Sequence, residues 1–522
     1  MDQKELSLGL EFGSTRIKAT LIDRCFIPVA EGSFEWENSY ENGVWTYPYS
    51  EIIGGMRDCY ADLKKNFADK YGVPLTTFGA AGVSGMMHGY IPLGPEDQPL
   101  APFRTWRNTL TGRAASELTG LFGFNIPQRW SIAHLYQAAL DGERHLFELR
   151  RLATVSVLVH LLLTGEYVAG IGEASGMFPV DPLTNDYDVR MERIFDGLIA
   201  DRGYPWKLRR VLPRVLCAGE LAGRLTPFGA AMLDPSGDLK PGVPFAPPEG
   251  DAGTGMVATD SVAARTGNVS AGTSDFAMIV TDRPMGVHRE IDVVATPAGL
   301  PVAMVHCNNC TSDINAWAGL FGELASALGS RISRNALFEL LFTRALEGDP
   351  DCGGLMNYNY VSGEGVTGLD AGRPLFTRTP DSRFTLSNFM RTQLLSALAT
   401  LKIGLDILVN EENIPIDTLR AHGGFFRTRE VGQRMLSAAV GAPVSVTATA
   451  GEGGPYGMAL LASYMLMKEE GETLERFLAD RVFANARTVT VTASGEDIAG
   501  FAAFLERYKK GLPVERAAAE LL

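Results

Sequence analysis

Residues 6–23, LSLGLEFGSTRIKATLID, decide the fold. An apolar run leads into Gly13-Ser14-Thr15, and a second apolar run follows. This pattern predicts two strands joined by a tight turn of small residues. Such a turn points backbone N–H groups and small hydroxyls at one spot, which suits a phosphate. Glu11 lies just before the turn and Lys18 just after it. An acid here can hold a metal ion and a cation can meet a phosphate, so we expect a nucleotide site.

The same pattern returns in the second half of the chain, at residues 265–282, RTGNVSAGTSDFAMIVTD. Gly272-Thr273-Ser274 again joins two strand-like runs, and a Pro- and Gly-rich stretch at 241–250 separates the halves. A chain of 522 residues is too long for one core. We therefore expect two similar lobes, each built on this unit, with both turns beside a shared cleft.

Helical and strand-like segments alternate along the rest of the chain, which predicts an α/β architecture. The expected helices are residues 51–71, 111–122, 132–149, 387–410 and 430–440. The expected strands are residues 77–83, 419–422, 444–447 and 488–492. Residues 452–457 are expected to begin a helix of small residues. Close packing of this helix is the favoured interpretation of the small residues, and contact with a ligand is the alternative.

Composition excludes several classes of protein. The net charge of -14 argues against binding to nucleic acid or to an anionic membrane. We expect no signal peptide and no membrane span, and the apolar run 152–163 is predicted to be a buried helix. Cys307 and Cys310 are closely spaced, but nothing completes a zinc set. Reduced thiols near a strand end are the favoured interpretation, and a redox pair is the alternative.

Asp251 lies in the glycine-rich stretch 250–255, GDAGTG. A carboxylate on such flexible backbone could accept a proton from a hydroxyl that attacks phosphorus. It could equally cap the next helix. Taken alone, the segment is equally consistent with a catalytic base and with a helix cap.

Other segments offer contacts to a polar ligand. Met87 and His88 follow a predicted strand, and Trp106 and Asn108 could form a wall for a sugar-like ligand. Each is more often structural when taken alone. The pair Gly423-Gly424 between a strand and a helix is most often plain turn chemistry.

Taken in order, these segments resemble the FGGY family of carbohydrate kinases, the xylulokinases most, from about Leu6 to Ala462. The family's first motif appears as Glu11 to Thr15 with Lys18, and its sugar motif as residues 86–89. Its catalytic Asp corresponds to Asp251. Its phosphate turn and its adenosine-side glycines correspond to residues 272–274 and 423–424.

The resemblance implies two actin-like, ribonuclease H-like ATPase domains around a central cleft, at residues 1–248 and 249–465. Residues 466–522 would be an extension packed on the second domain. It also implies Mg²⁺ and ATP as cofactors, a sugar substrate and a cytoplasmic enzyme, and it leaves a homodimer open.

The resemblance further implies that Asp251 is the catalytic base and that Glu11 and Asp251 hold the metal. Met87, His88, Trp106, Asn108 and Asp251 bind the sugar. ATP is bound by Gly13, Ser14, Thr15, Lys18, Gly272, Thr273, Ser274, Gly423 and Gly424.

The chain departs from the family pattern at Glu11, where an Asp is usual, and at Met86, where a Gln is usual. An acid is also missing from the segment after Trp106. The substrate therefore need not be xylulose, although a ketopentose or related sugar is expected. The alternatives are a non-catalytic regulator that binds sugar or nucleotide, and an actin- or chaperone-like ATPase.

Overall fold

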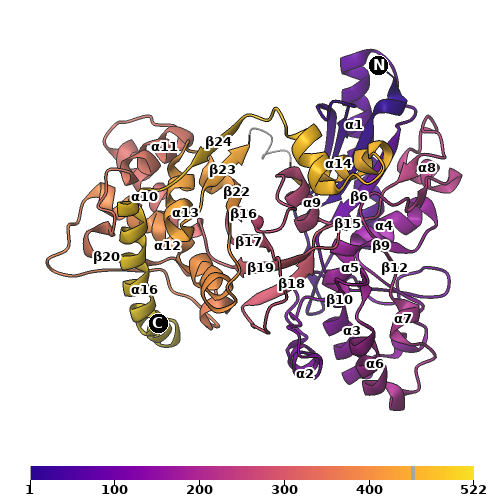
Figure 1. The fold of residues 1–522 in the computed structure, drawn as a ribbon, viewed down its shortest axis with the longest axis horizontal. Helices are drawn as coiled ribbons and strands as arrows, with labels where there is room; N and C mark the ends of the chain where they lie inside the picture. Colours follow the sequence, from indigo (N-terminus) through magenta and orange to yellow (C-terminus); the bar gives the residue numbers. More distant parts are fainter. Residues whose placement is uncertain (1, 448–452) are drawn as a thin grey trace. The chain divides into compact units, whose positions relative to one another are not determined.

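The computed structural model describes residues 2–447 and 453–522, whose contacts form two compact units (Figure 1). The first unit comprises residues 2–262, 292–302 and 453–485. The second comprises residues 263–291, 303–447 and 486–522. Because both units are assembled from discontinuous segments, the domain boundaries expected at 248/249 and 465/466 stay a prediction.

The first unit is built on a mixed sheet of strand order β13-β14-β6-β1-β2-β3, with β15 also paired to β6. These strands are β1 (Ser7–Phe12), β2 (Arg16–Ile22), β3 (Pro28–Glu35), β6 (Ala80–Gly85), β13 (Gly223–Arg224), β14 (Pro244–Phe245) and β15 (Glu249–Gly250). β1 and β2 form the expected antiparallel hairpin, whereas β1 and β15 run parallel to β6. The carboxyl ends of three neighbouring strands therefore meet at one edge, where ligands bind in α/β sheets.

The helices of the first unit are α1 (Tyr49–Tyr71), α2 (Gly112–Phe122), α3 (Ser131–Leu140), α4 (Val155–Thr164), α5 (Ile171–Met177), α6 (Val189–Leu198), α7 (Leu208–Val211), α8 (Pro227–Leu233), α9 (Asp251–Ala258), α14 (Gly453–Met467) and α15 (Leu474–Arg476). α1 packs on β2 and β3, and α14 packs on β1, β6 and α9. A Cβ at Gly9 of β1 would lie 1.9 Å from the backbone oxygen of Pro455 in α14. The close packing expected of this helix is confirmed, while residue 452 lies outside the described residues.

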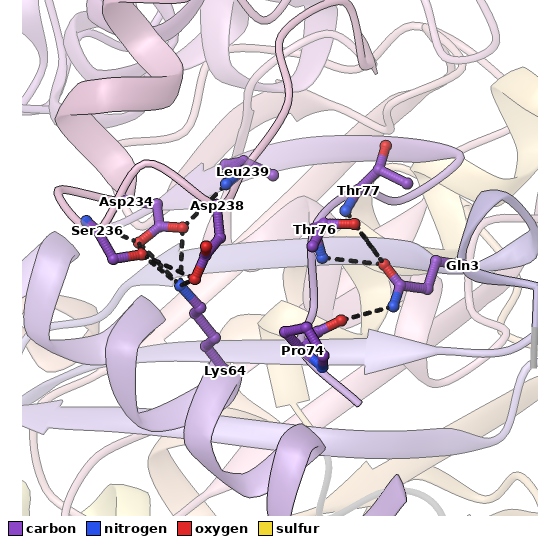
Figure 2. A network of polar contacts seen from close by, with 9 residues as sticks. All are labelled: Gln3, Lys64, Pro74, Thr76, Thr77, Asp234, Ser236, Asp238 and Leu239. Carbon is purple, nitrogen blue, oxygen red and sulfur yellow. Dashed lines mark hydrogen bonds and ion pairs between the residues drawn. The ribbon is translucent and has the colours of Figure 1, made fainter. Parts of the chain in front are cut away.

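Polar side chains tie the periphery of the first unit together (Figure 2). Gln3, in the short helix η1 (Gln3–Glu5), accepts a hydrogen bond from the Thr76 backbone N–H at 2.9 Å. The Lys64 ammonium, on α1, lies 3.0 Å from Asp234 and 2.6 Å from Asp238 (Figure 2). These bonds fix the N-terminus and the loop after α8 against the rest of the unit.

The second unit repeats the strand–turn–strand pattern. Its sheet runs β19-β17-β16-β22-β23-β24. The strands are β16 (Thr266–Ala271), β17 (Asp275–Val280), β19 (Pro301–Cys307), β22 (Thr418–His422), β23 (Val444–Thr447) and β24 (Thr488–Val491). As in the first unit, β16 forms an antiparallel hairpin with β17 and pairs in parallel with β22. The predicted reuse of one supersecondary unit is confirmed at this level.

Among the described residues, the α-helices of the second unit are α10 (Ser312–Ala327), α11 (Arg334–Ala345), α12 (Leu386–Asp406), α13 (Val431–Val440) and α16 (Gly495–Leu521). Shorter strands complete the two units: β4 (Ser39–Glu41), β5 (Val44–Thr46), β7 (Ile91–Leu93), β8 (Arg151–Ala153), β9 (Val168–Gly170), β10 (Val180–Asp181), β11 (Asp186–Tyr187), β12 (Arg214–Leu216), β18 (Ile291–Ala295), β20 (Leu355–Tyr358) and β21 (Leu375–Arg378). Among the described residues, one helical segment, Leu386–Glu411, is long and apolar enough to cross a membrane. Most of it is buried inside the protein, as in a core helix.

One predicted helix is wrong in extent. Residues 132–149 do not form a single helix, because α3 ends at Leu140 and a separate 3-10 helix, η2 (Arg144–Phe147), follows. Gly142, at φ 69°, adopts the left-handed conformation that terminates helices. The cysteine interpretation holds: Cys307 ends β19, and both it and Cys310 are buried free thiols.

Candidate functional site

Three neighbouring parallel strands bring Glu11, Met87 and Asp251 together at one edge of the first sheet. Glu11 of β1 and Glu249 of β15 lie on opposite sides of Ser84 of β6, in the same row. The chain then leaves β6 through Met87 and leaves β15 through Asp251, the first residue of α9. Asp251 Oδ1 accepts a hydrogen bond from the Met87 backbone N–H at 3.2 Å. The strand register therefore places an acid from β1 and an acid from α9 beside the segment after β6.

Burial raises the pKa of both acids. The pKa of Glu11 is raised to about 7, chiefly by burial and next by the Asp251 carboxylate, whereas Lys18 opposes the shift. Lys18 lies directly opposite Glu11 in the β1–β2 hairpin. Burial likewise raises the pKa of Asp251 to about 6, although the hydrogen bond from the Met87 backbone N–H lowers this pKa. Two buried carboxylates of this kind favour a cation between or beside them.

The two carboxylates match the donor set that Mg²⁺ uses in phosphate chemistry. No group of three or more His, Cys, Asp or Glu in the described chain is arranged to hold a metal ion by itself. Mg²⁺ is usually bound by one or two carboxylates together with substrate phosphates and water. Glu11 and Asp251 therefore fit a magnesium ion that is shared with a phosphate ligand.

In the turn after β1, the hydroxyl-bearing side chains are exposed, whereas two backbone carbonyl groups accept hydrogen bonds from the protein's own side chains. The Gly13 carbonyl accepts a hydrogen bond from Trp36 Nε1 at 2.7 Å, and the Ser14 carbonyl accepts one from the Tyr47 hydroxyl at 2.6 Å. Ser14 and Thr15 are exposed. Because the two carbonyl groups are bonded to aromatic side chains, the turn presents mainly donors to an incoming anion.

His88 is held in a fixed orientation. Its backbone is left-handed at φ 69°, its Nδ1 donates to the Gly176 carbonyl at 3.1 Å, and its ring stacks on Trp130. Space for this arrangement comes from glycines. A Cβ at Gly176 would lie 2.8 Å from His88 Nδ1, and a Cβ at Gly250 would lie 2.2 Å from Met87 Cγ. Met87 and His88 are therefore placed by the backbone around them.

Trp106 and Asn108 differ in exposure. Trp106 is 37% exposed, whereas Asn108 is buried. The Asn108 side-chain amide donates to the backbone oxygens of Trp45 and Thr105 at 2.8 and 3.0 Å, and its oxygen accepts from the Trp45 N–H. Asn108 thus holds this loop in shape, and its direct contact with a sugar stays a prediction.

In the second unit, the two expected nucleotide segments lie at the same edge of the sheet. Residues 272–274 follow β16 and residues 423–424 follow β22, and Ser270 pairs with His422 at the ends of these parallel strands. Gly423 has φ 103°, and a Cβ there would lie 2.3 Å from the backbone oxygen of Ala271. Only glycine fits this approach.

Sequence reasoning missed several buried acids beside these segments. Glu249 accepts from the Glu173 N–H at 2.9 Å, and burial raises the pKa of Glu249 to about 8 and that of Glu173 well above its ordinary value. In the second unit, burial raises the pKa of Asp275 well above its ordinary value and that of Glu364 to about 7. Glu249 directly precedes the glycine-rich stretch 250–255, and Asp275 directly follows the turn 272–274, so their position beside a motif could have indicated them. Glu173 and Glu364 have no such signal.

Comparisons with known proteins agree with this architecture. The sequence model of the FGGY family of carbohydrate kinases, C-terminal domain, matches residues 267–466. A xylulose kinase from Haemophilus influenzae is 22% identical over 356 residues, 66% of this chain and 67% of that protein. An L-fuculokinase from Escherichia coli is 25% identical over 245 residues, 44% of this chain and 48% of that protein.

Solved structures show the same fold over nearly all of the chain. A ligand-bound xylulose kinase from Lactobacillus acidophilus superposes with a TM-score of 0.80 at 15% identity, covering 98% of this chain and 99% of that one. The expected α/β fold with two actin-like ATPase domains is confirmed by this likeness.

Proposed function

We propose that this chain, which belongs to the FGGY family of carbohydrate kinases, phosphorylates a hydroxyl of a ketopentose or related sugar. The phosphate donor in this family is ATP. The observation that carries the proposal is the hydrogen bond from Met87 N–H to Asp251, which joins the carboxylate to the segment that resembles the family's sugar motif.

Asp251 is the proposed catalytic base. Its carboxylate would accept the proton of the sugar hydroxyl while the hydroxyl oxygen forms a bond to the γ-phosphorus and the bond to the β-phosphate oxygen breaks, releasing ADP. With a pKa raised to about 6, the carboxylate is ionised at neutral pH yet more basic than an exposed Asp. A base tuned toward the working pH is more effective in proton transfer.

Met87 and His88 are the proposed sugar contacts. The bond from His88 Nδ1 to the Gly176 carbonyl sets the ring plane, and the stack on Trp130 supports it. The half-exposed ring of Trp106 would offer an apolar face to the sugar carbons. Asn108 would act on the same ligand by holding the Trp45 and Thr105 backbone.

ATP contacts are proposed in both units. In the first unit they are Gly13, Ser14, Thr15 and Lys18, and in the second unit they are Gly272, Thr273, Ser274, Gly423 and Gly424. Glu11 and Asp251 would hold Mg²⁺, which when bound offsets the negative charge of the phosphates. We further propose a cytoplasmic enzyme without nucleic-acid or membrane partners, and a homodimer stays a prediction that light scattering can test.

The test is a coupled assay of ADP release over a panel of ketoses, aldoses and polyols. Because two relatives of this chain are named xylulose kinase and L-fuculokinase, the panel includes D- and L-xylulose, ribulose and fuculose. Asp251→Asn should lower sugar-stimulated turnover by about 100- to 10,000-fold. The exposed Asp201→Asn is the matched control and should behave as the wild type.

ADP release that no sugar stimulates would contradict the proposal, as would full turnover by Asp251→Asn. Thermal stabilisation by a sugar without any turnover would instead favour the non-catalytic regulator. Peptide-stimulated hydrolysis would favour the chaperone-like alternative.

A further inference from the structure

A groove lies in the first unit, on elements that the proposed kinase site does not use. It has a volume of about 590 Å³, within the range of small-molecule sites. Its lining includes three basic side chains, Arg150, Lys207 and Arg210, and two aromatic ones, Tyr204 and Trp206. The described residues that line it include no acid.

The three cations lack a carboxylate partner among the described residues, although the chain carries a net charge of -14. Arg209 pairs with Asp186 and Glu192, whereas the adjacent Arg210 forms no ion pair with any described residue. Lys207 and Arg150 likewise lack a carboxylate partner in the described chain. Three uncompensated charges around one groove attract an anion.

The aromatic side of the groove is rigid and flat. The rings of Tyr204 and Trp206 are stacked, with centroids 5.4 Å apart and planes at 5°. Trp206 Nε1 donates to the Leu146 carbonyl at 2.7 Å, which fixes the indole. Phe147 meets Tyr204 edge-on at 5.1 Å and is 51% exposed. Trp206 is buried, so the partly exposed Tyr204 ring, backed by the indole, is the surface that favours a planar ring.

We propose that this groove is an accessory binding site for a phosphorylated small molecule that carries a flat ring, such as a nucleoside monophosphate. Arginine forks and a lysine ammonium together match the oxygens of a phosphate ester. The stacked aromatic pair matches the ring. A phosphate without a ring, or a ring without a phosphate, would use only half of the groove.

The groove is joined to the segment that holds Met87 and His88. Arg150 N–H donates to the Leu93 carbonyl at 2.8 Å, where β8 pairs with β7. On the other side, His145 of η2 shares a 2.6 Å hydrogen bond with the Tyr90 hydroxyl. Residues 90–93 continue directly from the proposed sugar motif, so a ligand in the groove rests on the same framework.

The test uses pyridoxal 5′-phosphate, a ring-bearing phosphate ester, on the full chain. Its aldehyde forms an imine with a lysine amine with loss of water, and borohydride reduces the imine to a stable amine. Peptide mass spectrometry then gives the labelling rate at each lysine. We expect Lys207 to be labelled at least about tenfold faster than the exposed Lys240, because the arginines bind the phosphate first.

Competitors and variants separate the components of the site. AMP should protect Lys207 at concentrations where ribose 5-phosphate, inorganic phosphate and adenosine do not. Arg150→Gln with Arg210→Gln should slow labelling of Lys207 by about tenfold. Arg193→Gln, an exposed change of the same charge, should leave it unchanged. Thermal unfolding at the wild-type temperature shows that each variant is folded.

Equal labelling of Lys207 and Lys240 would overturn the proposal. So would labelling that neither AMP nor the arginine substitutions reduce. Protection by ribose 5-phosphate as strong as that by AMP would overturn the assignment of a ring-bearing ligand. None of these readouts depends on sugar phosphorylation, so the proposed function can fail without affecting them.

Discussion

Gly454→Ala places a methyl group against the acid that departs from the family pattern. A Cβ at residue 454 would lie 1.9 Å from Glu11 Oε1 and 3.1 Å from Thr254 Oγ1. Ordinary contact begins near 3.4 Å, so the Glu11 carboxylate must withdraw by about 1.5 Å or α14 must move. The helix has little room to move, because a Cβ at Gly457 would already lie 1.9 Å from the Thr254 backbone oxygen.

The clash should lower both stability and turnover. Overpacking of this kind costs about 1–3 kcal/mol of unfolding free energy. A displacement of about 1 Å in a catalytic group costs on the order of 100-fold in rate. We therefore expect Gly454→Ala to lower kcat for sugar-stimulated ADP release by about 100-fold, with a reduced unfolding temperature. Gly120→Ala, at an exposed glycine of α2 with open space around it, is the control and should retain wild-type kcat.

A double-mutant cycle makes the cause specific. Glu11→Asp removes one methylene and draws the carboxylate back by about 1.5 Å, which restores ordinary contact with Ala at 454. Gly454→Ala should therefore cost less in the Glu11→Asp background, with a coupling energy of at least about 1 kcal/mol. Wild-type turnover and stability in Gly454→Ala would refute the reasoning. So would an equal cost of Gly454→Ala in both backgrounds.

The remaining predictions concern charge. Glu11→Gln should abolish sugar-stimulated ADP release at an unchanged unfolding temperature, because a carboxyl whose pKa is raised to about 7 loses little on becoming an amide; retained turnover would contradict this. Asp497→Asn should lower the unfolding free energy by about 3 kcal/mol in urea titrations, because the buried Arg391 loses its partner at 2.6 Å. Burial opposes ionisation of Asp497, but hydrogen bonds from Arg434 and Arg391 outweigh it and lower the pKa of Asp497 from 3.8 to about 2. The contribution of Asp497 to the unfolding free energy is therefore complete above pH 3.8 and is lost as the pH falls toward 2. An equally steep acid transition in the Asn variant would contradict this prediction. EDTA should abolish turnover and added Mg²⁺ should restore it, whereas activity that survives chelation would exclude the metal.

Local patterns were enough to predict the two hairpins. The turns at Gly13 and Gly272 and their flanking apolar runs are encoded by adjacent residues, and the hairpins form where expected. The α/β class also followed from alternating periodicities. The helix over 132–149 failed because one glycine, Gly142, adopts a left-handed backbone that periodicity does not record.

Contacts between distant segments could not be predicted. Nothing in the spacing of Trp106 and Asn108 indicates that the Asn108 side-chain amide donates a hydrogen bond to the Trp45 backbone, 63 residues away. Glu173 lies in an unremarked helical segment, and only the pairing of β15 beside β6 brings Glu249 and Asp251 next to it. The contact between Gly454 and Glu11 likewise arises from α14 packing on β1.

The buried acids of the first unit argue for phosphate chemistry independently of any motif. Burial raises the pKa of Glu11, Asp251, Glu249 and Glu173, and the charge of Asp251 raises the pKa of both Glu11 and Glu173. Keeping buried carboxyl groups together is costly unless protons or a cation offset their charge. Glu249 and Glu173, with the higher pKa values, can retain protons at neutral pH. Asp251 does not, and Glu11, with a pKa raised to about 7, is only partly ionised, so Mg²⁺ bound with a phosphate would favour the fully ionised pair.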